Sequence, residues 1–216
     1  PAFDMTQGST LPARPAFDMT QGSTLPARPA FDVIEVTSTP ARPAFDQVDQ
    51  IYLDTAGLVL VWPFLGTFFE RFEWLFDKKT FIDETARARA VLLVQYLATL
   101  DPEPPEYRLP LAKVLCGLPL DDVFVVDTEV TEVEAKEAAD LLMALLDHAK
   151  TFGEISIADF RDAFLLRRGI LSTRDGSWLL RVERTPYDVV LQRLPWPSSW
   201  VRLPWMEAPL AVEWLR

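Results

Sequence analysis

The sequence has few of the residues on which catalysis and metal binding usually depend. Its 216 residues include one cysteine, Cys116, and one histidine, His148. A single cysteine cannot form a disulfide within the chain or build a multi-cysteine metal cluster. A nucleophile–base pair of Cys116 and His148 is formally possible, but no local motif supports it. Cys116 lies in an apolar stretch, where a buried, inert thiol is the usual state.

Glycine and positive charge are also scarce. None of the eight glycines falls into the spacing of a phosphate-binding loop, and no acidic calcium-binding loop occurs. We therefore expect no catalytic residue, no cofactor and no metal. The 21 basic and 32 acidic residues leave a net charge of −11, which argues against nucleic acid and anionic membranes as partners.

Long hydrophobic runs are missing as well. The most apolar stretch, Leu58 to Phe69, is too short to span a bilayer and contains Pro63. We interpret it as a buried core helix. No secretion signal is visible at the N-terminus, and the chain opens inside a repeating pattern. We therefore expect it to be a piece of a longer protein.

The clearest positive feature is a tandem repeat of fourteen residues. Residues 1–14 read PAFDMTQGSTLPAR, residues 15–28 repeat them unchanged, residues 29–42 read PAFDVIEVTSTPAR, and residues 43–46 begin a fourth unit. One aromatic residue per unit cannot offset the entropy lost on ordering fourteen residues. Prolines at the junctions between units disfavour a helix. We predict an extended, proline-rich arm over residues 1–46.

The arm is suited to a partner that is itself periodic. Each complete unit offers the same aromatic and the same cation at fixed spacing. The predicted partner contacts are Phe3, Phe17, Phe31, Phe45, Arg14, Arg28 and Arg42. A semi-rigid linker is the alternative interpretation.

Residues 49–216 have the composition of a compact domain. Residues 51–77 predict two helical pieces interrupted by Pro63. Asp83 predicts the start of a helix that runs to Leu100, and a short helix is expected from Pro110 to the stop at Gly117. Thr131 and Glu134 form a capping-box signature for a further helix. Ser156 predicts the cap of the next, ending at Gly169.

The pattern then changes from helical to alternating. Trp178, Leu180 and Val182 alternate with Leu179, Arg181 and Glu183 after an Asp175–Gly176 turn. Two further strands are expected, one containing Tyr187, Val189 and Leu191 and one from Leu210 to Trp214. The sequence therefore predicts an α+β fold, mostly helical and ending in a small antiparallel sheet.

The final segment is rich in tryptophan, arginine and proline. It is interpreted either as a proline-braced stretch whose aromatic residues pack on the sheet or as an exposed docking patch. The residues of the predicted patch are Trp196, Trp200, Arg202 and Trp205.

Several segments carry a resemblance to a known family. They include AGLVLVWPFL from Ala56, LPLAKVLCGLPLD from Leu109, GEISIADFRDAFLLRRGIL from Gly153, WLLRVERTPYDVVLQRLPW from Trp178 and RLPWMEAPLAVEW from Arg202. In this order they resemble the C-terminal region of tape-measure proteins of contractile injection systems, the phage-tail-like particles of the extracellular type.

The resemblance implies a structural assembly protein. Such a protein is made in the cytoplasm, runs along the lumen of the inner tube of the particle and sets the tube length. Its C-terminal domain is anchored at the spike and baseplate. The implied partners are the inner tube protein and the spike and baseplate hub proteins, and a homo-oligomer, trimer or ring, is expected. The alternative is a free adaptor whose proline-rich repeats bind a soluble partner.

Overall fold

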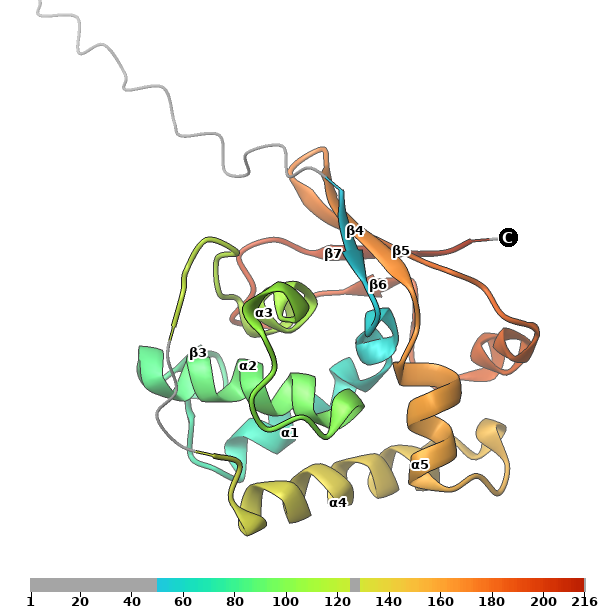
Figure 1. Ribbon diagram of the computed structural model, residues 1–216, viewed down its shortest axis with the longest axis horizontal. Coiled ribbons are helices and arrows are strands. Elements are labelled where there is room, and N and C mark those ends of the chain that lie inside the picture. Colours follow the sequence, from blue (N-terminus) through green and yellow to red (C-terminus); the bar gives the residue numbers. More distant parts are fainter. Residues whose placement is uncertain (1–49, 125–128, 216) are drawn as a thin grey trace, which may run out of the picture. The chain divides into compact units, whose positions relative to one another are not determined.

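The computed structural model describes residues 50–124 and 129–215 (Figure 1). The arm predicted over residues 1–46 and its seven predicted contact residues lie outside the described residues. The α-helices are α1 (Trp62–Glu70), α2 (Glu84–Thr99), α3 (Pro110–Cys116), α4 (Glu132–His148) and α5 (Ile157–Phe160). The shorter helical turns are η1 (Ala56–Val61), η2 (Glu106–Arg108), η3 (Lys150–Phe152), the π-helical η4 (Arg161–Leu165) and η5 (Pro186–Arg193).

The strands form a sheet of five and a separate pair. The larger sheet has the order β1-β4-β5-β7-β6, and β2 pairs with β3. The strands are β1 (Ile51–Leu53), β2 (Leu75–Phe76), β3 (Thr80–Phe81), β4 (Gly169–Arg174), β5 (Ser177–Val182), β6 (Trp200–Val201) and β7 (Leu210–Trp214). The α+β prediction is confirmed.

The five-stranded sheet is mixed, which corrects the antiparallel expectation. β5 and β7 run parallel, with Leu180 opposite Val212, whereas the other pairs are antiparallel. An alternating pattern shows which side chains share a face, but it does not fix the direction of the neighbouring strand. Between β5 and β7 the chain forms η5 and then β6, which runs antiparallel to β7 at the edge of the sheet, so β7 has the same direction as β5.

The helices gather on one side of the sheet and build the core with it. In Figure 1, α3 lies next to the strands and α4 lies at the far end of the helical group. All six residues of η1 are buried, which places the first half of the apolar stretch at the centre of the core. Leu93 and Leu97 of α2, Leu142 of α4 and Leu180 of β5 are completely buried in the same cluster. Its apolar burial is the main source of stability.

Local capping signals account for several helix boundaries. The side chain of Asp83 accepts a hydrogen bond from the amide of Ala86 at the start of α2. Thr131 and Glu134 form the predicted capping box of α4. Gly117 ends α3 with a φ of 67°, a left-handed conformation that is strained for residues with a Cβ atom. These predictions are confirmed.

Three predicted elements are wrong. Residues 51–53 form a strand, and the helix that follows the Ser156 cap ends at Leu165, so that Gly169 begins β4. The strand expected around Val189 is the helical turn η5. Thr185 and Asp188 form a capping box there, with proline at the first helical position, and this local geometry outweighs the alternating pattern.

Candidate partner-binding surface

The two faces of the sheet differ in chemistry because of its register. Residues opposite one another on neighbouring strands project to the same face. One row, Ile51, Leu171, Leu180 and Val212, belongs to the inner face, which packs on the core. The next row consists of Tyr52, Ile170, Arg181 and Glu213. We call the face that carries this second row the outer sheet face.

A groove of about 620 Å³ lies at the β1 edge of the outer sheet face. Its walls come from β1, η2, the start of β4, the end of β5 and the last described residue. The lining residues are Tyr52, Leu53, Asp54, Tyr107, Arg108, Arg168, Gly169, Ile170, Arg181, Glu183 and Leu215. Two tyrosines that line it are mostly exposed, Tyr52 at 76% and Tyr107 at 70%, so aromatic surface there is open to a partner.

The groove is rich in guanidinium groups although the chain as a whole is acidic. Three arginines and two carboxylates line it, in a chain whose net charge is −11. Arg108 forms a loose ion pair with Asp54, at 3.7 Å between Nε and Oδ2. The Nε of Arg181 is buried and has no hydrogen-bond partner among the described residues. A buried donor without an acceptor is costly, so this nitrogen favours a ligand that carries an acceptor.

The predicted C-terminal patch separates into buried and exposed residues. Trp205 is 9% exposed, and its Nε1 donates to the carbonyl of Leu115 at 2.9 Å. The packing interpretation therefore describes Trp205. Trp200 is 49% exposed, and Arg202 is exposed. Trp196 is half-buried, with its ring edge-on to Phe64 at 5.3 Å.

Trp200 belongs to the outer sheet face. It lies opposite Ala211 of β7, which in turn lies opposite Leu179 of β5. That row is adjacent to the one that contains Arg181. The exposed part of the predicted patch and the groove therefore occupy opposite edges of one surface.

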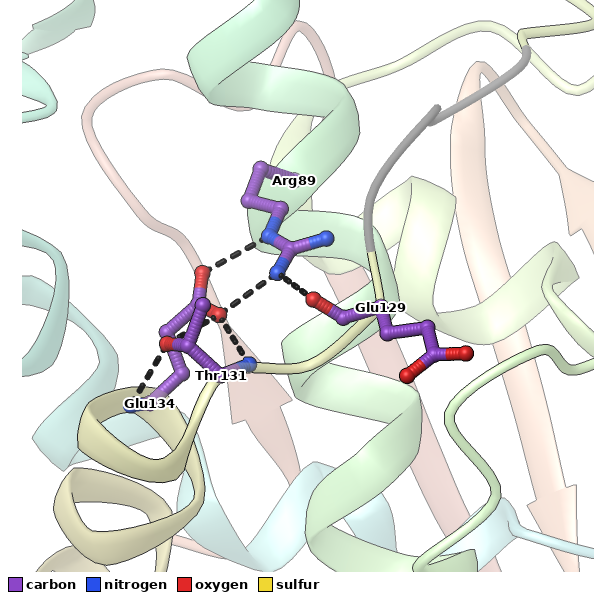
Figure 2. Close-up of polar contacts among 4 residues, drawn as sticks. All are labelled: Arg89, Glu129, Thr131 and Glu134. Atoms are coloured by element: carbon purple, nitrogen blue, oxygen red, sulfur yellow. Dashed lines mark hydrogen bonds and ion pairs between the residues drawn. The ribbon is translucent and has the colours of Figure 1, made fainter.

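Two buried ion pairs link separate elements of the domain. Figure 2 shows Arg89 of α2 bonded to both carboxylate oxygens of Glu134 and to the carbonyl of Glu129. Burial alone would raise the pKa of the Glu134 carboxyl, but hydrogen bonds from Arg89 and Thr131 outweigh it and lower that pKa below its usual value.

The second buried pair links the chain just before β4 to η5. Arg167 donates to both carboxylate oxygens of Asp188, at 2.7 and 2.9 Å. Burial again opposes the charged carboxylate, and the bonds from Arg167 and Thr185 again prevail, so the pKa of Asp188 is lowered. Both pairs are too well satisfied to act on a substrate, and we assign them a structural role.

A comparison with known families identifies the family of this chain. The model of the family described as "Contractile injection system tape measure protein" matches residues 17–214. The chain belongs to this family. Comparisons with curated proteins and with solved structures find no match.

The role of a tape measure protein is structural, and it sits within the tube of the assembled particle. The side chains considered for catalysis fit that role. Cys116 is completely buried, and burial raises the pKa of its thiol far above the usual value, which keeps it protonated. His148 is exposed at the end of α4, with its ring stacked on Trp196 at 5.9 Å between centroids.

The described part of this tape measure protein also contains no cluster of three or more potential metal ligands. No helix among the described residues is long and apolar enough to cross a membrane.

The groove residues have no motif in the sequence that points to them. In the sequence, Arg181 only alternates with the apolar positions of its strand. Tyr52, Tyr107 and Arg168 come from three other segments, and only the sheet register and the placement of η2 bring them together. A short-range motif could not have shown this.

Proposed function

We propose that this chain sets the length of the inner tube of a contractile injection particle. The repeat arm of residues 1–46 would run along the tube lumen, and the domain of residues 49–216 would be anchored at the spike and baseplate. The observation that carries the proposal is the span of the family match. It covers the folded domain and extends back to residue 17, inside the repeats.

The length of the repeat suits a ruler. An extended chain rises about 3.1 Å per residue, so a unit of fourteen residues would span about 43 Å, whereas a helical unit would span only about 21 Å. Stacked rings of a tube present the same surface at a fixed interval. In this proposal Phe3, Phe17, Phe31 and Phe45 enter equivalent apolar pockets of the inner tube protein, and Arg14, Arg28 and Arg42 meet acidic groups.

The outer sheet face would supply the anchor. Trp200 is exposed on this face and Arg202, two residues later in the chain, is exposed as well. Tryptophan and arginine contribute more than other residues to binding energy at interfaces. Their partners in this proposal are the spike and baseplate hub proteins. Because a protein centred in a symmetric tube usually shares its symmetry, we also propose that the domain assembles as a trimer or ring.

The test is a series of particles assembled with one repeat deleted, with the native number and with one repeat added. The expected result is a change in tube length by one fixed step per unit, measured in electron micrographs. A matched insertion of the same fourteen residues into the exposed Asp175–Gly176 turn controls for added mass. Unchanged lengths across the series would contradict the ruler role.

The repeats also permit an adaptor function. Tandem copies of one motif raise the affinity for a multivalent partner through effective concentration. In that case the loss of one unit would weaken binding to a soluble partner and leave the particle length unchanged.

A further inference from the structure

The groove on the outer sheet face has the chemistry of a binding site for an aromatic residue followed by a carboxylate. We propose that it binds the Pro-Ala-Phe-Asp motif at the start of a repeat that belongs to a second copy of this chain. The inference concerns contacts between copies in solution and does not rest on the length-setting role.

The repeat keeps one short motif while the rest of the unit changes. Its third unit differs from the first two at most internal positions, MTQGSTL having become VIEVTST. All four units nevertheless begin with Pro-Ala-Phe-Asp, including the unit that starts at Pro43. The part that stays the same among the copies is an aromatic side chain beside a carboxylate.

The groove and the motif are complementary in charge and in shape. The exposed rings of Tyr52 and Tyr107 offer apolar surface to a phenylalanine. Arg108, Arg168 and Arg181 line the same groove, and guanidinium groups pair with carboxylates in two-bond geometry. The Nε of Arg181 has no acceptor among the described residues, so the bonding capacity of this guanidinium is not used up within the domain.

The groove lies beside β1, at the edge of the sheet. Among the described strands β1 pairs only with β4, and an edge strand is a template for a strand from another chain. Ten residues between Pro1 and Pro12 contain no proline, so this part of a unit keeps every amide that such pairing needs. Residues 1–49 precede β1 and lie outside the described part. This length of chain contains three complete units.

The experiment uses the full chain in sedimentation velocity over a range of concentrations. Reversible association into dimers or larger species is expected. Arg181→Glu and Tyr107→Ala should each weaken it on the order of tenfold. Tyr107 is 70% exposed, so Tyr107→Ala tests the groove even if Arg181→Glu impairs folding. Arg174→Glu is the matched control, because Arg174 pairs with Glu213 at 2.9 Å and does not line the groove.

A free peptide of residues 1–14 completes the test. Excess peptide should dissociate the oligomer by occupying the groove, whereas the same peptide with Phe3→Ala and Asp4→Lys should not. A chain that stays monomeric at every concentration would overturn the proposal. The groove would then be empty, occupied by the repeats of the same chain, or used by another protein. Association that survives both groove variants would overturn it as well. Neither result would affect the particle-length experiment, so the two proposals can fail separately.

Discussion

Arg89 of α2 and Glu134 of α4 form a buried ion pair between residues that lie 45 positions apart in the sequence, with two hydrogen bonds of 2.7 and 2.5 Å. The carboxylate of Glu134 also accepts bonds from the amide and hydroxyl of Thr131, at the start of its own helix. The carboxylate of Glu134 therefore takes part in the cap of α4 and also attaches this helix to α2 (Figure 2). The carbonyl of Glu129 receives a further bond from Arg89, which draws the preceding chain into the contact.

We expect Arg89→Met to lower the free energy of unfolding by about 3–5 kcal/mol, because it leaves the Glu134 carboxylate buried without its partner. The measurement is urea unfolding followed by tryptophan fluorescence. The control is Arg71→Met. Arg71 forms an exposed ion pair with Glu137, which lies in α4 like Glu134, and its loss should cost no more than about 1 kcal/mol. Equal effects of the two substitutions would contradict the structural role of the buried pair.

Acid should destabilise the domain through Glu134 and Asp188. The pKa of each carboxyl is lower in the folded state than its ordinary value. Each carboxylate therefore contributes its full stabilisation above the ordinary carboxyl pKa of about 4, and that contribution is lost as the pH falls through the lowered folded pKa. When the free energy of unfolding is measured at pH values from 7 downward, it should decrease once the pH is lower than about 4. The slope should be shallower in Glu134→Gln and in Asp188→Asn, and a slope unchanged in both would contradict the assignment.

Two glycines early in the domain should respond in opposite ways to alanine. A Cβ atom on Gly57 would lie 1.7 Å from the carbonyl oxygen of Phe164, a backbone atom that cannot move aside. Gly57→Ala is expected to cost about 3 kcal/mol or more. Gly66 lies inside α1, where the nearest atom to a new Cβ is 4.0 Å away. Gly66→Ala should therefore stabilise the protein by about 0.5–1 kcal/mol. Thermal unfolding distinguishes the two, and a loss at Gly66 would show that the helix packs more tightly there.

Substitution of two tryptophans in the C-terminal segment should have different effects, one on stability and the other on partner binding. Trp205 packs against Phe69 and Phe81, each at 5.5 Å between ring centroids, so Trp205→Ala is expected to cost about 3–5 kcal/mol of stability. Trp200→Ala should leave the unfolding midpoint nearly unchanged and weaken co-purification with the proposed baseplate hub partner. If Trp200→Ala kept full partner binding, the exposed edge of the outer sheet face would not be the anchor.

Local signals were enough to predict much of the helical part. Asp83, Thr131 and Ser156 cap helices within three residues of themselves, and such bonds depend only on neighbours in the chain. The Asp175–Gly176 hairpin is equally local, with both residues at positive φ. The three-residue strand β1 was not predictable in this way, because its stability comes from pairing with β4, more than a hundred positions later.

By itself the sequence determined that the N-terminal arm is a repeat with one aromatic residue per unit, that the domain is α+β, and that its segments resemble those of tape measure proteins. These properties depend on composition, on spacing and on contacts between near neighbours. Only the tertiary structure decided that Trp205 is a core residue while Trp200 is exposed, since both stand in the same proline-rich stretch. It alone placed Tyr52, Tyr107, Arg168 and Arg181 around one groove. The physical reason is that strand register and helix packing unite residues from distant segments, and the free energy that selects one register comes from burying the whole inner face at once.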